Sequence, residues 1–323
     1  MGKTSIEWTD ASWNPVVGCT EVSPGCANCY AARLAATRLR HTSQYKNLAR
    51  NSAQAGPRWT AQVRFLPDRL EEPLHWRKPR RIFVCDMGDL FHESVPDEFL
   101  ASVFRIMSRA SHHTFQVLTK RAARMKQFVS SVKEWEGFHT HNGEPPKGYG
   151  GHGQIVGSQW PLPNVWLGVS VENQHFAEER IPLLLGTPAV VRFLSCEPLL
   201  SDLNLRMWVN PNRMPMYTVR WVIAGGESGL NARPMQPDWV RSLRDQCIAA
   251  AVPFFFKQWG EWAPLTDAEY KILMNTEEHK IPLRVRHTSY LQNGQTICWE
   301  RIGKKKAGRL LDGREWNEFP VTA

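Results

Sequence analysis

Short runs of apolar residues recur along the chain at a regular spacing. Continuous apolar runs of this length, rich in β-branched and aromatic side chains, are typical of strands that are buried on both faces of a parallel sheet. Most runs start about 30 residues after the previous one, which is the length of a strand, a helix and two loops. The pattern therefore predicts consecutive βα units. The six runs begin at Arg81, Phe115, Val165, Val191, Trp221 and Pro253.

Amphipathic segments with helix start signals lie between these runs. Pro96 precedes one of them, a second follows Lys120, and Pro237 precedes a third. With residues 13–19 as a first strand, the number of strands reaches six or seven. We therefore expect an α/β fold, in which residues 1–262 form a partial (βα)6–7 TIM-type barrel.

Three segments depart from this repeat. A stretch rich in glycine, histidine and proline, about 137–163, predicts a loop insertion. A second irregular insertion spans about 38–80. After residue 262 the repeat stops, and we expect residues 263–323 to form a small C-terminal appendage that contains β-structure.

The composition fits a globular protein that can bury a substantial core. The chain has 323 residues, of which 42% are apolar, with 14 tryptophans and 14 phenylalanines. No run of about 18 apolar residues occurs and the first residues carry no secretory signal, so we expect a cytoplasmic protein without a membrane span. Lysine and arginine outnumber aspartate and glutamate by 40 to 31, and the resulting charge of +9 favours polyanionic partners such as nucleic acid.

Three of the seven cysteines, Cys19, Cys26 and Cys29, lie within eleven positions. In a reduced compartment, clustered cysteines are more often ligands or reactive groups than disulfide partners. Three thiolates in one loop can bind three irons of a [4Fe–4S] cluster and leave the fourth iron open. The open iron could bind S-adenosylmethionine (SAM), whose reductive cleavage would give a 5′-deoxyadenosyl radical. Tyr30 would then pack near the adenine.

Two other metal chemistries remain open for this chain. A zinc site could combine the three cysteines with His41 or His92, and the C-x2-C spacing of Cys26 and Cys29 suits zinc. However, no fourth ligand lies at the spacing of a zinc knuckle. A metal-dependent hydrolase on the same barrel would instead use the acidic and histidine side chains Asp86, Asp89, His92 and Glu197.

Polar or ionisable residues end nearly every predicted strand. Because the carboxyl ends of the strands in a parallel barrel converge on one face, we expect these residues to share a site with the cysteine loop. For any single residue, a solvated loop position is the alternative. The candidate catalytic residues are Glu197, Lys257 and Cys196, the last as a hydrogen-atom donor like Cys85. The candidate cofactor contacts at strand ends are Asp86, Asp89, Ser170, Glu172, Gly225, Gly226 and Glu227.

The strand end at residues 224–228 is rich in glycine and carries a carboxylate. The backbone N–H groups of Gly225 and Gly226 could bind a carboxylate or a ribose, while Glu227 could bind an ammonium group. Paired glycines are also common in ordinary turns. The segment 86–93 could form a metal or acid–base cluster from Asp86, Asp89, His92 and Glu93, or could be a helix-entry loop whose aspartates cap the helix.

Basic residues alternate with aromatic ones in the insertion at about 38–80. The rings could stack on bases while the arginines bind phosphates. The same pattern also occurs in ordinary packed segments. The candidate nucleic-acid contacts are Arg38, Arg40, Arg58, Trp59 and Arg64.

Several motifs occur in an order that resembles the phage-associated three-Cys-motif family over most of residues 4–262. They include TSIEWTDASWNPVVGC, SPGCANCYA, DMGDLFHESVP, NVWLGVSVEN, RFLSCEPLL, AGGESGLNARPM and FFFKQWG. That family resembles a divergent branch of the radical SAM superfamily, closest to spore photoproduct lyase. The resemblance implies a partial TIM barrel, Cys19, Cys26 and Cys29 as cluster ligands, and Glu227 in contact with the methionine amino group. The segment 86–89, which follows the second strand, is the alternative for that contact.

The expected function is therefore that of a radical SAM-like iron–sulfur enzyme that modifies or repairs a nucleic acid base or nucleotide. DNA repair is one such role. A reductant such as flavodoxin or ferredoxin would supply the electron. A zinc-binding nucleic-acid-binding protein without redox chemistry and a metal-dependent hydrolase remain the alternatives.

Overall fold

The computed structural model of the chain describes residues 4–52, 56–131, 160–210, 212, 214, 217–265, 285–290 and 296–321. The predicted insertion at about 137–163 lies almost entirely outside these described residues. No helix within the described ranges is long and apolar enough to cross a membrane.

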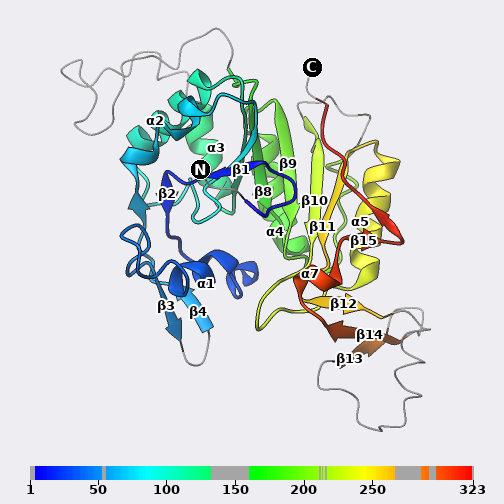
Figure 1. Cartoon of the computed structure of the whole chain (residues 1–323). Coiled ribbons are helices and arrows are strands. Elements are labelled where there is room, and N and C mark those ends of the chain that lie inside the picture. The colour runs from blue at the N-terminus through cyan, green and yellow to red at the C-terminus, as the bar shows by residue number, and fades with distance from the viewer. Residues whose placement is uncertain are drawn as a thin grey trace, which may run out of the picture.

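Seven parallel strands, adjacent in chain order, form one sheet that curls into a half-barrel (Figure 1). The six predicted strands are confirmed as β6 to β11. The predicted first strand, residues 13–19, does not coincide with the first strand of the sheet, which is β1. The following Val16–Val17 (β2) pairs with Arg64–Phe65 (β5) outside the sheet. The strands of the sheet are β1 (Ala11–Trp13), β6 (Arg81–Val84), β7 (Thr114–Thr119), β8 (Val165–Ser170), β9 (Val191–Cys196), β10 (Trp221–Gly225) and β11 (Phe254–Gln258).

Four helices cover one face of the sheet. The three helices predicted from the sequence are confirmed as α2 (Asp97–Arg109), α3 (Ala122–Ser130) and α5 (Pro237–Ala249). A fourth, α4 (Gln174–Leu185), begins where the Asn173 side chain accepts a hydrogen bond from the Phe176 backbone N–H at 3.2 Å. The apolar side chains of these helices form the main core with one face of the strands.

The other face of the sheet, on the inside of the half-barrel, is covered by the two ends of the described chain. Side chains alternate between the faces along each strand, so Phe83 and Trp221 point inward. Trp8, from the N-terminal segment, lies 4.7 Å from Phe83, and Phe319, near the C-terminus, lies 5.2 Å from Trp221 between ring centroids. Both ends therefore help to fill the interior of the half-barrel.

The predicted insertion at about 38–80 forms a small irregular layer beside the cysteine loop. It contains the hairpin of β3 (Ala49–Ser52) and β4 (Gly56–Trp59), which packs against α1 (Tyr30–Ala36). Two short 3-10 helices, η2 (Pro67–Arg69) and η3 (Glu72–His75), return the chain to β6.

The C-terminal segment is in contact with the edge of the main sheet. Leu311 and Trp316 belong to the main core, and the Phe256 backbone N–H donates to the Trp316 carbonyl at 2.9 Å. The sequence analysis did not predict these contacts. The elements of this segment are β12 (Trp262–Pro264), β13 (Val285–Tyr290), β14 (Thr296–Arg301), α7 (Lys304–Ala307), β15 (Leu310–Leu311) and β16 (Arg314–Glu315).

Candidate functional site

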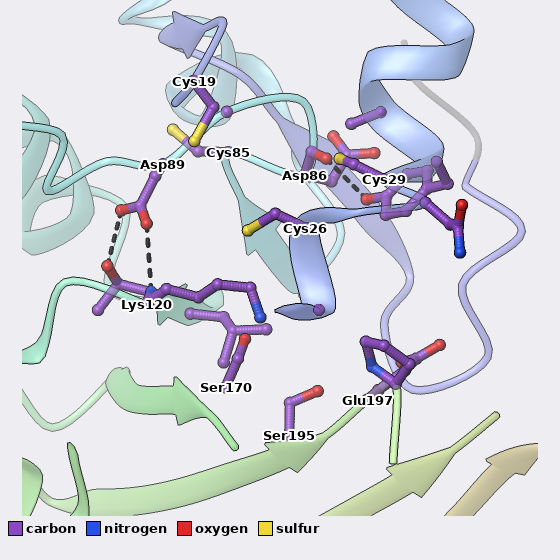
Figure 2. A pocket seen from close by; sticks show the side chains of 18 of the residues that line it. Cys19, Cys26, Cys29, Cys85, Asp86, Asp89, Lys120, Ser170, Ser195 and Glu197 are labelled. Carbon is purple, nitrogen blue, oxygen red and sulfur yellow. Dashed lines mark hydrogen bonds between the residues drawn. The ribbon is translucent and has the colours of Figure 1, made fainter. Parts of the chain in front are cut away.

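A pocket lies at the carboxyl end of the parallel sheet, between the strand ends and the cysteine loop (Figure 2). Its lining includes an apolar part formed by Ile6, Trp8, Phe83 and Leu118. The structure thus brings the strand ends and the cysteine loop to one cavity, as the parallel topology requires. The predicted site residues that line it are Cys19, Cys26, Cys29, Tyr30, Trp59, Cys85, Asp86, Asp89, Ser170, Glu197, Gly226, Glu227 and Lys257.

The cysteine loop follows β2 and leads into α1. Gly18, at its start, has a φ of +90°, and a Cβ there would overlap the Gln62 carbonyl oxygen and lie 3.2 Å from its carbon. A short 3-10 helix, η1 (Pro24–Cys26), turns the chain, and Cys29 occupies the N-cap position of α1. The three cysteines are therefore presented from a tightly packed loop.

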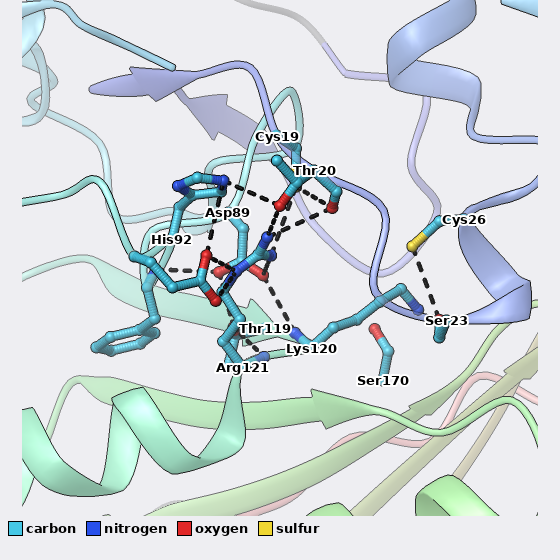
Figure 3. Close-up of polar contacts among 12 residues, drawn as sticks. Cys19, Thr20, Ser23, Cys26, Asp89, His92, Thr119, Lys120, Arg121 and Ser170 are labelled. Carbon is cyan, nitrogen blue, oxygen red and sulfur yellow. Dashed lines mark hydrogen bonds and ion pairs between the residues drawn. The ribbon is translucent and has the colours of Figure 1, made fainter. Parts of the chain in front are cut away.

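The Cys19 thiol is next to a buried arginine (Figure 3). The Arg121 Nη1 lies 3.6 Å from the Cys19 sulfur, and its guanidinium also pairs with Asp89 at 3.0 Å and Glu93 at 2.9 Å. Burial, with the Asp89 carboxylate, raises the pKa of the Cys19 thiol to about 12, although Arg121 acts in the opposite direction. The free thiol is therefore the favoured form of Cys19 in the absence of a bound cation.

The other two cysteines have different surroundings. Burial raises the pKa of Cys29, while the nearby backbone N–H groups of Ala32 and Ala31 and the Trp59 side chain act in the opposite direction. The Cys26 sulfur lies 3.7 Å from the Ser23 hydroxyl. All seven cysteines are free of disulfide bonds.

The fit of these cysteines to a metal centre can be tested on their arrangement. Within the described part of the chain, no group of three or more His, Cys, Asp or Glu side chains is poised to hold a metal ion. The three cysteines themselves, their pairing with His41 or His92, and the four residues of the hydrolase alternative are all among the side chains to which this applies. The soft donor set itself suits iron–sulfur or zinc chemistry, because three free thiols line one cavity and the Arg121 guanidinium donates to one of the sulfurs.

Glu172, a predicted cofactor contact, does not line the pocket. Its carboxylate is fully buried, pairs with Lys120 and with Arg180 at 3.0 Å, and accepts a hydrogen bond from the Ser23 hydroxyl at 2.6 Å. A Cβ on Gly25 would come within 2.9 Å of the Glu172 carboxyl carbon. Glu172 therefore holds the cysteine loop against the end of β8.

Glu227 has a comparable set of partners on the other side of the loop. Its carboxylate accepts hydrogen bonds from Arg233 at 2.6 Å and from the Asn28 side chain at 2.9 Å. Arg233 also donates to the Pro24 carbonyl at 2.9 Å. The negative charge of Glu227 is thus already compensated within the protein. An ammonium ligand would therefore be attracted to it less strongly.

The two aspartates after β6 line the pocket but have protein partners. The Asp89 carboxylate accepts from Thr119 at 2.7 Å and from Arg121 at 3.0 Å. Asp86 accepts from Asn14 at 2.5 Å, and burial raises its pKa. The Tyr30 hydroxyl donates to the Asp86 backbone carbonyl at 2.7 Å, which fixes the tyrosine beside the cavity.

Gly226 and Cys196 have packing roles rather than free contacts with the cavity. The Gly226 N–H donates to the Gln258 carbonyl at 2.9 Å, so it is not available to a ligand, and Gly225 lies within β10 and does not line the pocket. Cys196 is fully buried in the main core, because its position in β9 points toward the helices. A role for its thiol inside the pocket is therefore not supported, whereas Cys85 does line the pocket.

The predicted nucleic-acid residues are divided between structural and exposed positions. Arg64 donates to the backbone carbonyls of residues 43, 44 and 46, and Arg58 donates to the Ala27 carbonyl and pairs with Glu21 at 3.1 Å. These two guanidiniums stabilise the insertion and the cysteine loop. Arg38 and Arg40 are exposed.

A family model described as a protein of unknown function (DUF5131) matches residues 3–320. The chain belongs to the DUF5131 family. No curated protein and no solved structure matches it significantly.

Sequence reasoning missed several residues that shape the pocket of this DUF5131 protein. Arg121 and Arg233 were not selected, although each follows a predicted strand end by a few positions and binds the carboxylate of a selected residue. Ile6 and Trp8 were also missed, because an N-terminal segment gives no periodic signal that places it inside a barrel. The signal that could have identified the arginines was the high density of carboxylates at the same strand ends.

The raised pKa of Cys19 predicts slow alkylation in the metal-free folded protein. Because its thiolate fraction follows a pKa of about 12, the rate of reaction with iodoacetamide should still rise about tenfold per pH unit between pH 9 and 10. In protein unfolded in urea, the rate should level off above pH 9. Mass spectrometry of the Cys19 peptide measures both rates. A folded-state rate that also levels off near pH 9 would contradict the predicted burial effect.

Proposed function

We propose that this DUF5131 protein is a radical SAM-like iron–sulfur enzyme that modifies or repairs a nucleic acid base or nucleotide on a partial TIM-type barrel. The observation that carries the proposal is the placement of Cys19, Cys26 and Cys29, from one loop, in the lining of a single cavity at the carboxyl ends of seven parallel strands. Catalytic sites of parallel barrels lie at this end.

The surroundings of the three thiols support binding of a [4Fe–4S] cluster with one open iron. Arg121 lies beside the sulfur of Cys19, and the N-terminus of α1 lies beside that of Cys29. Both positive groups stabilise thiolate charge. When bound, the cluster and SAM would supply a carbon-centred radical.

The remaining residues of the pocket would position the ligands and exclude water. Glu172 and Arg233 hold the cysteine loop in place, while Ile6, Trp8 and Phe83 give the cavity an apolar part from which water is excluded. Tyr30 would pack beside the adenine, with Ser170 as a further contact for the cofactor.

A nucleic acid or nucleotide is the proposed substrate because of the net charge of +9 and the exposed basic residues that follow α1. Arg38 and Arg40 are the candidates for phosphate contacts. The resemblance to the phage-associated three-Cys-motif family is the further support for a role in modification or repair.

The deciding experiment is anaerobic purification and iron–sulfur reconstitution, followed by reduction with dithionite in the presence of SAM. We expect about four irons per chain, brown colour, and formation of 5′-deoxyadenosine measured by chromatography. The variant in which Cys19, Cys26 and Cys29 are all alanine should lose both iron and product. Cys247→Ala, which removes a thiol from the main core, should keep both.

Two results would count against this function. A colourless protein that holds one zinc and forms no 5′-deoxyadenosine would favour the zinc-binding alternative. An activity that survives in the triple alanine variant would exclude a role for the cysteine loop in the chemistry.

A further inference from the structure

An ion pair crosses the pocket end of β10. Lys257, in β11, donates from Nζ to both carboxylate oxygens of Glu197, which follows β9, at 2.7 and 2.8 Å. The strand between them ends in Gly225, where an added Cβ would make ordinary contacts at 3.4 Å with the Glu197 carboxyl carbon and the Lys257 Cβ. The two side chains therefore meet directly above the end of the intervening strand.

This ion pair is part of the cavity surface. Both residues line the pocket, with 10% of the Lys257 side chain and 19% of the Glu197 side chain exposed. The other protein contact of the Glu197 carboxylate is the Gln258 side chain at 3.2 Å. The Lys257 ammonium has three protons, and two of them are used in its hydrogen bonds to Glu197. One N–H of Lys257 can therefore still donate to a ligand, and the Glu197 carboxylate can still accept a hydrogen bond.

Two hydroxyl groups near the pair have no partner in the described protein. Ser170 and Ser195 end the neighbouring strands β8 and β9 and are paired in register. Their residues are 5% and 2% exposed, both line the pocket, and neither hydroxyl has a hydrogen bond to a described residue. Neither oxygen is fully buried, so each is accessible from the cavity and can donate or accept a hydrogen bond with a ligand there.

The charges of this part of the pocket favour a neutral ligand over an anion. The Glu197 carboxylate neutralises Lys257 and would repel a phosphate or carboxylate group. Trp8 and Phe83 also line this pocket, with 2% and 7% of the two residues exposed. Figure 2 shows Ser195 and Glu197 on the side of the pocket away from Cys19 and Asp89.

We propose that Glu197, Lys257 and Ser195 bind the hydrogen-bonding edge of a nucleobase, whose planar ring packs against the Trp8 and Phe83 side of the cavity. A base edge places a hydrogen-bond donor beside an acceptor, which matches a carboxylate next to an ammonium group. Aromatic side chains supply the stacking surface that bases prefer. This inference rests on the proposed function and specifies the part of the substrate that the pocket recognises.

The test is isothermal titration calorimetry on the full-length, anaerobically reconstituted protein. The probes are uridine, cytidine, adenosine and guanosine, with ribose 5-phosphate as the probe for phosphate recognition. We expect at least one nucleoside to bind and ribose 5-phosphate not to bind. Glu197→Gln should weaken the nucleoside affinity roughly 10- to 100-fold, the range for loss of a hydrogen bond to a charged group.

A charge-reversed double variant separates recognition from a structural role. Glu197→Lys combined with Lys257→Glu keeps an ion pair but exchanges the positions of the donor and the acceptor. We therefore expect nucleoside binding to stay weak in this variant, even when its midpoint of urea unfolding returns to that of the wild type. Asp312→Asn, at a surface ion pair with Arg241 and Arg244, is the matched control and should bind like the wild type.

Recovery of nucleoside affinity in the charge-reversed variant would overturn the inference. So would the absence of nucleoside binding, or equal binding of ribose 5-phosphate. Iron content and 5′-deoxyadenosine formation, measured on the same preparations, distinguish this failure from failure of the proposed function, because both depend on the cysteine loop.

Discussion

Replacing Glu172 with alanine is expected to lower the free energy of unfolding by about 3–5 kcal/mol, the usual cost of removing one partner from a buried ion pair. Glu172 and Arg180 are at most 1% exposed, and their charges lie 3.0 Å apart. The variant leaves Arg180 buried without its carboxylate, and its Nε already has no hydrogen-bond partner among the described residues. Urea unfolding followed by circular dichroism measures the change.

The same substitution should also loosen the cysteine loop. Ser23 would lose its 2.6 Å hydrogen bond, and the close packing of Gly25 on the carboxylate would be lost. We therefore expect the reconstituted variant to retain less iron than the wild type. The matched control is Glu178→Ala on the exposed side of α4, where the carboxylate contacts Gln174, and its cost should stay below about 0.5 kcal/mol.

The pH dependence of stability provides an independent check on Glu172. Burial opposes its ionisation, but Lys120 and Arg180 outweigh that effect and lower the pKa below 4.5. Since a depressed carboxyl pKa stabilises the fold above the unfolded-state value, this contribution is present above pH 4.5 and is lost as the pH falls through the folded-state pKa. Glu172→Gln should lack it, and an acid unfolding profile equal to that of the wild type would contradict the ion-pair assignment.

The positions of six strands and three helices could be predicted because each depends on local sequence. Buried parallel strands are continuous apolar runs, and Pro237 at the first turn of α5 is a local start signal. The first strand was misplaced because of a non-local contact. Val16 and Val17 are apolar, but they pair with β5, a contact that no spacing in the sequence encodes.

The convergence of strand ends on the cysteine loop was predictable from topology, whereas the role of each side chain was not. Glu172 and Ser23 are 149 positions apart and Asn28 and Glu227 are 199 apart, so the sequence offers no signal for either hydrogen bond. In contrast, the orientation of Cys196 follows from the period of two along β9. Ser195, the preceding residue, faces the pocket, which places Cys196 in the core.

The hydrogen bonds to the cysteine loop explain why so many carboxylates occur at the strand ends. Glu172 and Glu227 bind the loop on its two sides, and Asp89 orients Arg121 beside Cys19. Glu172, Glu227 and Asp89 were selected as candidate cofactor contacts because they follow the ends of predicted strands. In the folded protein their charges are compensated by nearby cations, which leaves the Glu197 and Lys257 pair and the free serine hydroxyls as the groups with capacity for a ligand.

Gly226→Ala is expected to destabilise the protein by roughly 3 kcal/mol, the upper end of the range for overpacking. A Cβ at Gly226 would overlap the Trp259 carbonyl oxygen and lie 2.6 Å from its carbonyl carbon. These are backbone atoms directly after β11, so relief requires movement of the strand end that carries Lys257. The variant should therefore lose stability in urea and also weaken any ligand binding that depends on Lys257.

The adjacent glycine is the matched control for this prediction. At Gly225 an added Cβ would meet its nearest neighbours at 3.4 Å, an ordinary contact distance, and no positive φ restricts the position. Glycine within a strand is destabilising by about 0.5–1 kcal/mol relative to alanine, so Gly225→Ala should be neutral or slightly stabilising. If Gly225→Ala and Gly226→Ala lower the free energy of unfolding equally, the close approach of β10 to Trp259 is not the reason for glycine at position 226.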